Sequence, residues 1–209
     1  GTFTVHPSYG VALSTSFRFV ASGWTDPEGH GLTYSFSFVG STGAEVVVGG
    51  GSDPFANSTL PKGTDLAVTA TITDALGASA VVSASPVTAS LADDQVVGSV
   101  LAAATGVADL IAHGDDEHAM SVLALCAETL NAGAGGDAAA ARDARRTLLE
   151  LTRNATAAAP ATPEAVSARA ATLGLLADAA PDAPADASGA TAVAVAARLA
   201  NSRRAVGFL

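Results

Sequence analysis

Cysteine and basic residues are both scarce in this chain. Among its 209 residues there is one cysteine, Cys126, so no disulfide can form within the chain. Extracellular domains of this size often have one. Ten lysines and arginines stand against twenty aspartates and glutamates, which gives a formal net charge of −10. Nucleic-acid binding draws its affinity from a basic surface, so we expect no nucleic-acid partner for this acidic chain.

A long uninterrupted apolar segment is also absent. The longest helical segment, Val96 to His113, is broken by Gly98, Gly106 and Asp109, and it is rich in alanine. A bilayer span needs about 20 mostly apolar residues, so we expect no membrane contact by this segment. The chain begins at Gly1 without a basic or apolar leader, which predicts a mature or internal fragment.

The composition changes abruptly near Ser90, which predicts two domains, residues 1–90 and 91–209. Apolar and polar residues alternate in the first domain, with the period of a strand that has one buried face. Seven candidate strands follow: Phe3–Val5, Leu13–Ala21, Leu32–Val39, Ala44–Val48, Phe55–Leu60, Leu66–Thr73 and Ser79–Thr88. Seven short strands with turns between them predict an antiparallel β-sandwich of the immunoglobulin or fibronectin III type, with Trp24 packed into its core.

The second domain is rich in alanine, and its apolar residues recur at helical spacing. We predict about five helices, which begin at Asp93/Asp94, Asp115/Asp116, Asp137, Thr162-Pro163 and Ser188 or Thr191. Short connections between them favour antiparallel neighbours in a bundle. Alanine allows helices to approach closely but buries little apolar area, so this all-α domain should be only marginally stable by itself.

Two loops of the predicted sandwich carry carboxylates. In this architecture the loop 23–31 and the turn 74–77 meet at one pole, which would bring Asp26, Glu28 and Asp74 together. Three carboxylates and loop carbonyls are ligands that calcium prefers. The alternative is that Asp26-Pro-Glu-Gly29 is a turn and Asp74 opens a hairpin, each aspartate binding its own backbone. We favour the turns and keep calcium as a possible cofactor.

Two glycosylation sequons are present, Asn57-Ser-Thr59 and Asn154-Ala-Thr156. They favour an extracellular location, whereas the lack of paired cysteines argues mildly for the cytosol. Asn57 is the better acceptor, because it lies in a segment flanked by proline and glycine where a glycan would be accessible.

Three other segments contain residue types that are common in active sites. His113-Gly-Asp-Asp-Glu-His118 gathers imidazoles and carboxylates, but it lies where one helix stops and the next starts, so its carboxylates are explained as helix caps. Val46–Ser52 is glycine-rich but is followed by no lysine and no helix, so we interpret it as a flexible connection between strands and not a phosphate loop. Cys126 has no basic neighbour and is interpreted as a buried apolar residue. We therefore expect no catalytic residues and no enzyme activity.

The elements Trp24-Thr-Asp-Pro-Glu-Gly29 and Thr73-Asp-Ala-Leu-Gly77, with Ser52–Gly63 between them, resemble the REJ (receptor for egg jelly) module of polycystin-1-like proteins, including their algal relatives. The helical domain more loosely resembles the helical region before the autoproteolytic sandwich of such ectodomains. No His-Leu-Ser/Thr cleavage tripeptide occurs in this chain, so self-cleavage is not implied.

The resemblance implies an extracellular segment of a large membrane glycoprotein, acting in adhesion, sensing or mechanical spacing at a cell or ciliary surface. Its partners would be other extracellular domains or the rest of a larger chain. One alternative is a structural component of an extracellular filament or wall without a receptor role. An enzyme is a third possibility, and it predicts a pocket lined by His113, Asp115 and His118.

Overall fold

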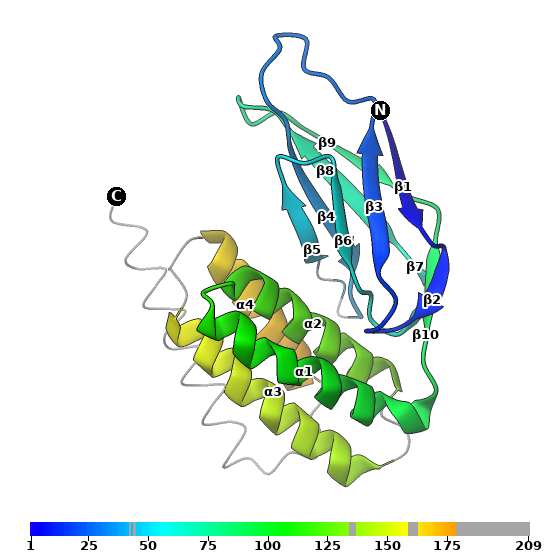
Figure 1. The fold of residues 1–209 in the computed structure, drawn as a ribbon, viewed down its shortest axis with the longest axis vertical. Helices are drawn as coiled ribbons and strands as arrows, with labels where there is room; N and C mark the ends of the chain where they lie inside the picture. The colour runs from blue at the N-terminus through cyan, green and yellow to red at the C-terminus, as the bar shows by residue number, and fades with distance from the viewer. Residues whose placement is uncertain (42, 44, 134–136, 159–162, 179–209) are drawn as a thin grey trace. The chain divides into compact units, whose positions relative to one another are not determined.

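The computed structural model describes residues 1–41, 43, 45–133, 137–158 and 163–178 (Figure 1). The chain divides into two compact units, Gly1–Leu91 and Ala92–Leu209. We call them the sheet unit and the helical unit. An all-β region followed by a helical region is therefore confirmed, and each unit is described by itself.

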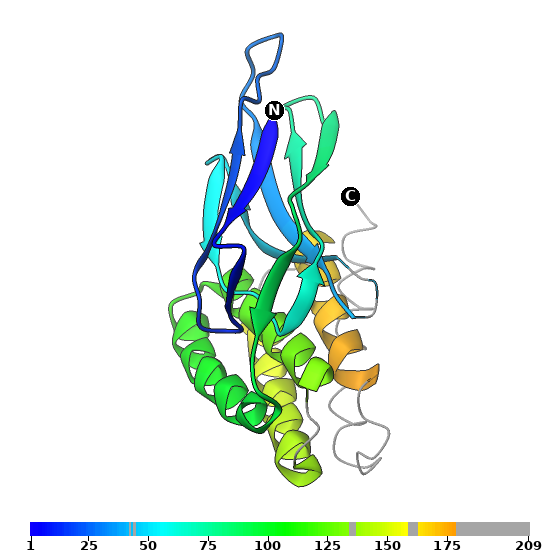
Figure 2. The same ribbon diagram turned by 90° about the vertical axis from the view of Figure 1, so that its right-hand side faces the viewer.

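The described residues of the sheet unit form ten strands, whereas the alternation predicted seven. They are β1 (Thr2–His6), β2 (Tyr9–Val11), β3 (Phe17–Ser22), β4 (Thr33–Val39), β5 (Glu45–Gly51), β6 (Phe55–Ser58), β7 (Gly63–Leu66), β8 (Val68–Thr73), β9 (Ser79–Ser83) and β10 (Val87–Ser90). They form three sheets, with the orders β1-β3-β6, β2-β10-β7 and β5-β4-β8-β9. All neighbours are antiparallel except β2 and β10, which are parallel. Figure 2 shows these strands stacked in layers.

Phenylalanine rings fill the space between the sheets. Phe17 and Phe19 on β3 and Phe36 and Phe38 on β4 are almost completely buried. The Phe36 ring lies 5.9 Å from Phe19 and 5.7 Å from Phe3, centroid to centroid, which joins the β1-β3-β6 sheet to the four-stranded sheet. Alternation along β3 and β8 places one apolar row in this core and one polar row outside it.

Two predicted strands are interrupted in the structure. The predicted strand Leu13–Ala21 begins only at Phe17, because Leu13 has a left-handed backbone (φ 58°) in the turn after β2. The predicted strand Ser79–Thr88 is divided into β9 and β10, and Pro86 lies in the break. Alternation continued through both interruptions, so the pattern alone did not reveal them.

Two further expectations about the sheet unit were wrong. The predicted strand Ala44–Val48 is present from Glu45 onward in β5, but β5 also includes Gly49–Gly51, which were interpreted as part of a flexible connection. Trp24 is only half-buried, so it does not anchor the core. Its ring packs on Gly1, where no Cβ could fit, and its Nε1 donates to the Thr2 carbonyl oxygen at 3.3 Å. Trp24 therefore holds Gly1 and Thr2 in place, and phenylalanine side chains fill the core. The immunoglobulin or fibronectin III class stays a prediction.

The helical unit begins with a short 3₁₀ turn, Asp93–Gln95, and continues with four described α-helices. These are α1 (Val96–Ala112), α2 (Asp116–Gly133), α3 (Ala138–Ala158) and α4 (Pro163–Asp178). They pack on one another as a bundle (Figure 1). The predicted fifth helix, from Ser188 or Thr191, lies outside the described residues.

Two of the predicted caps are formed as expected. The Asp137 Oδ1 accepts hydrogen bonds from the N–H groups of Ala139 and Ala140 at 2.9 and 3.1 Å, and so begins α3. Gly114, with φ of +76°, follows α1 as its stop signal. The cap predicted at Asp93/Asp94 was wrong, because α1 begins after Gln95 without a side-chain capping bond.

Candidate functional site

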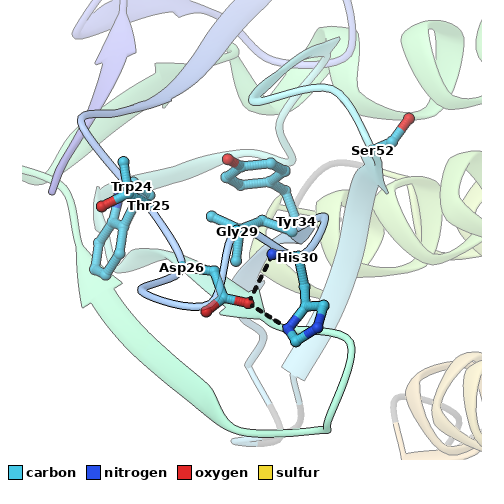
Figure 3. A pocket seen from close by; sticks show the side chains of 8 residues that line it. Trp24, Thr25, Asp26, Gly29, His30, Tyr34 and Ser52 are labelled. Atoms are coloured by element: carbon cyan, nitrogen blue, oxygen red, sulfur yellow. Dashed lines mark hydrogen bonds and ion pairs between the residues drawn. The ribbon is translucent and has the colours of Figure 1, made fainter.

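The loop between β3 and β4 is organised by the carboxylate of Asp26. Its Oδ1 accepts the Glu28 N–H at 2.8 Å, and its Oδ2 accepts the His30 N–H at 3.2 Å. The same Oδ2 lies 3.1 Å from Nδ1 of the His30 ring (Figure 3). Gly29 closes the turn with φ of +76° and donates its N–H to the Asp26 carbonyl. The Asp26 side chain is thereby 1% exposed. The favoured turn interpretation therefore describes this loop.

Asp74 has the same role in the β8–β9 hairpin. Its Oδ1 accepts the N–H groups of Leu76 and Ala78 at 2.9 and 2.8 Å, and Gly77 supplies the positive φ of 88°. Aspartate followed by glycine at this spacing is a common turn sequence, because the side chain replaces a backbone acceptor. Asp74 therefore stabilises a hairpin that the sequence predicted.

Asp26 and Glu28 are close enough to share a hydrogen bond, and each changes the pKa of the other. The shared bond, reinforced by the Glu28 N–H, lowers the pKa of Asp26 below its usual 3.8. The same bond raises the pKa of Glu28 above its usual 4.5, and the charge of Asp74 raises it further.

The His30 side chain lies beside this pair, and the sequence analysis did not assign it to a site. Ligand atoms of Asp26, Glu28 and His30 all lie within 4.8 Å of one another, whereas Asp74 is not in this group. The sequence feature that could have identified His30 is its position four residues after Asp26 in a glycine-rich loop. A calcium site at Asp26, Glu28 and Asp74 stays a prediction.

An open hollow of about 340 Å³ lies beside these groups. Its lining residues are Trp24, Thr25, Asp26, Gly29, His30, Leu32, Tyr34 and Ser52. Figure 3 shows the Trp24 and Tyr34 rings on either side of the loop, with Asp26 turned toward His30. The hollow combines aromatic surface with one carboxylate and one imidazole.

The His113–His118 segment forms the turn between α1 and α2. Asp115 caps α2, accepting the His118 N–H at 3.3 Å, and its other carboxylate oxygen lies 3.5 Å from the His118 ring. Nδ1 of His113 is 2.7 Å from the Asp109 carbonyl oxygen, so this imidazole is directed to its own helix. Both imidazoles thus have local partners, and this arrangement agrees with the capping interpretation.

The two sequons have different local structures. Asn57 is exposed on β6, an edge strand of its sheet, opposite Arg18. Asn154 is exposed on α3, but the hydroxyl of Thr156 in the same sequon is nearly buried and donates to the Thr152 carbonyl at 2.6 Å. Whether either is modified stays a prediction.

Cys126 is buried on α2, and burial raises the pKa of its thiol to about 12. Its Sγ faces the Val100 carbonyl oxygen at 3.8 Å. A thiol that stays protonated is a poor nucleophile.

One segment among the described residues, Asp93–Ala112, is long and apolar enough to cross a membrane by length and composition, with a mean hydropathy of 1.6. The interruptions at Gly98, Gly106 and Asp109 therefore do not exclude a span by that criterion. Core helices of soluble proteins satisfy it as well, so it assigns no span.

Comparison with known proteins gives one result. The family model of the REJ domain matches residues 1–125. The match covers the whole sheet unit and continues through α1 into α2, beyond the predicted end of the first domain at residue 90. No curated protein and no solved structure matches the chain.

Proposed function

The chain belongs to the REJ domain family, and from that premise we propose that it is a non-enzymatic, extracellular segment of a large polycystin/REJ-like membrane glycoprotein. Its role is adhesion, sensing or mechanical spacing at a cell or ciliary surface. The family match over residues 1–125 carries this proposal, because REJ domains belong to a receptor-type family without catalytic activity.

The parallel pairing of β2 and β10 favours mechanical spacing among these roles. The Thr88 N–H donates to the Ser8 carbonyl at 2.9 Å, and the Ala12 N–H donates to the Ser90 carbonyl at 3.0 Å. One strand lies near the beginning of the sheet unit and the other at its end. Tension between the two ends pulls parallel strands in opposite directions, so it shears these bonds together instead of opening them one at a time.

Surface labelling tests the location. The chain is expressed within its full-length parent protein, and intact cells are treated with a biotinylation reagent that does not cross membranes. We expect the segment to be labelled without permeabilisation. Labelling only after permeabilisation, with a surface receptor labelled in the same cells, would contradict the proposal.

Single-molecule pulling tests the spacing role. Stretched through its two ends, the sheet unit should unfold at a higher force than its Ala12→Pro variant, which lacks the N–H that bonds to Ser90. Ser79→Pro, on the outer edge of β9, is the matched control and should leave the force unchanged. Equal forces for Ala12→Pro and the native chain would remove the mechanical role and leave the surface location untouched.

A further inference from the structure

The strand β9 is an open edge of the four-stranded sheet. It is the last strand in the order β5-β4-β8-β9, and Val81 at its centre is 67% exposed. Among the described residues no backbone hydrogen bond joins its outer side to another strand, although β1 of the other layer approaches it. An uncovered edge is a template on which another strand can pair.

The register of the β8–β9 hairpin identifies which backbone groups this edge presents. The Ala78 carbonyl accepts the N–H of Asp74, the residue after β8, and the Ala84 N–H donates to the Val68 carbonyl of β8. Bonding alternates along an antiparallel pair, so Ala80 and Val82 also face β8. The N–H and C=O groups of the three residues between them face outward. These residues are Ser79, Val81 and Ser83.

The opposite edge of the same sheet is protected in ways that β9 is not. There β5 begins with Glu45, ends in three glycines, Gly49–Gly51, and pairs with β4 through a register shift between Phe36 and Ser37. Charges, bulges and irregular edges are the usual protection against pairing between sheets. β9 contains no charge, proline or bulge.

We propose that the β9 edge pairs with β9 of a second copy of this chain, in antiparallel orientation about a two-fold axis at Val81. The outward residues are symmetric about this point, because valine then meets valine and Ser79 meets Ser83 of the other copy. Such an interface is self-complementary, as a two-fold dimer requires. Each of the three pairs can exchange two backbone hydrogen bonds.

The charge distribution favours a second copy at this edge. The chain carries a net charge of −10, so two copies repel each other over most of their surface. No ionisable side chain occurs from Ala75 to Ala92, the segment that contains β9. Two copies can therefore bring these strands together without adding like charges at the contact. Leu76, 78% exposed at the hairpin tip, lies at the end of the same edge.

Pairing of this kind would join identical chains, and it does not depend on the extracellular role proposed above. Sedimentation velocity on the purified 209-residue chain measures it directly. We expect a concentration-dependent dimer. Val81→Lys should weaken it about tenfold, because two lysines then face each other across the axis. Val47→Lys is the matched control, since Val47 is an exposed valine on the opposite edge strand, and it should leave the dimer unchanged.

Crosslinking tests the register. Val81→Cys places a thiol at the proposed axis, whereas Cys126 is buried and unreactive. A short bis-maleimide should link two copies of Val81→Cys, and it should not link Val47→Cys. A chain that stays monomeric up to its highest soluble concentration overturns the proposal. A dimer that Val81→Lys leaves intact, or that Val81→Cys does not crosslink, overturns it too.

Discussion

The sheet unit and the helical unit bury different kinds of side chain. The sheet unit encloses four phenylalanines that are at most 1% exposed, and two of its ring contacts join separate sheets. The helical unit buries alanines and leucines, which permit close helix approach but remove less apolar area per residue from water. We therefore predict that the phenylalanine contacts make the sheet unit the more stable of the two.

The two units also differ in the polar side chains that they bury. Among the described residues of the sheet unit, Ser37 is the one polar residue that is buried as a whole, and it bonds to Glu45 and Thr69, while the Asp26 side chain is shielded within its turn. The helical unit buries Glu128, Thr129, Thr152, Thr156, Arg169 and Thr172. Buried charges bring a large desolvation cost, so they contribute less to stability than apolar groups of the same size.

The largest expected effect is on the sheet core. Phe36→Ala removes a ring that contacts both Phe3 and Phe19 and leaves a cavity, so it should lower the free energy of unfolding by about 3–5 kcal/mol. The sole tryptophan, Trp24, lies in the sheet unit, so its fluorescence during urea denaturation follows this unit alone. Far-ultraviolet circular dichroism follows the helices.

The matched control is Phe55→Ala, because Phe55 is 43% exposed and lies under Arg18, whose guanidinium is 5.2 Å from the ring centroid. It should cost about 1 kcal/mol or less. If Phe36→Ala shifts the fluorescence and dichroism transitions equally, the two units unfold together and the comparison between them loses its basis.

A smaller loss is expected from the helical core. Leu148 on α3 is fully buried, and Leu148→Ala should cost about 2–4 kcal/mol, measured by the dichroism transition. Leu101→Ala on the exposed side of α1 is the control and should cost well under half as much. Because we expect the helical unit to be the less stable of the two, Leu148→Ala should move the dichroism transition to lower urea while the Trp24 fluorescence transition stays unchanged. Loss of the native fluorescence would show that the sheet unit depends on the helices.

Arg169 tests the difference in buried polarity. Burial lowers the pKa of this guanidinium, and the Asp116 carboxylate partly opposes the shift. Arg169→Met keeps the length of the side chain but leaves the Asp116 carboxylate without the opposing charge, so the dichroism transition should move to lower urea. The double variant Asp116→Leu/Arg169→Met removes both charges and should recover much of this loss. Arg169→Ala loses the packing as well and should move the transition to lower urea. If the double variant is no more stable than Arg169→Met, the pair of buried charges stabilises the bundle, and the difference in buried polarity does not weaken the helical unit.

Local patterns predicted the elements well wherever one residue determines the local backbone. Alternation identified the buried rows of β3, β4 and β8, and Asp137 and Gly114 marked helix ends correctly. The strand break at Leu13 was missed, because its left-handed backbone is imposed by contacts distant in sequence, including the bond from its N–H to the Leu60 carbonyl. Such contacts are absent from any short window of sequence.

The candidate site was predictable only in part, for the same reason. Asp26 and Asp74 were recognised as turn residues from neighbouring proline and glycine. His30 was not assigned to the group, because its place beside Asp26 depends on the path of the loop and not on a helical or strand period. The role of Trp24 was mistaken because its partner, Gly1, lies outside every predicted strand.

The two sequons provide a comparison between strand and helix. Expressed through a secretory pathway, the chain should carry a glycan at Asn57, since this side chain is exposed on an extended edge strand. Asn154 should stay largely unmodified, because Thr156 of its sequon is held within α3. Asn57→Gln should abolish the mobility shift that a glycosidase reverses, and Asn154→Gln should not. The reverse pattern would show that modification precedes folding of α3.

The smallest effect concerns the loop charges of the sheet unit. The raised pKa of Glu28 means that its protonated form favours folding below about pH 4.5, and this contribution is lost as the pH rises through the raised pKa. The lowered pKa of Asp26 has the opposite sign: its contribution is present above pH 3.8 and is lost as the pH falls through the lowered value. At neutral pH, therefore, Glu28 is repelled by Asp26 and Asp74.

Either a cation or a neutral side chain should relieve that repulsion. Glu28→Gln should raise the melting temperature of the Trp24 fluorescence transition slightly at neutral pH, and the gain should vanish near pH 4. Calcium at millimolar concentration should produce a similar small rise in the native chain, because carboxylate oxygens bind it, and none in Glu28→Gln. A calcium response that survives in Glu28→Gln would locate the ion elsewhere. If calcium produces neither heat nor a shift in the native chain, the two aspartates serve their turns alone, and the loops of the sheet unit hold no metal.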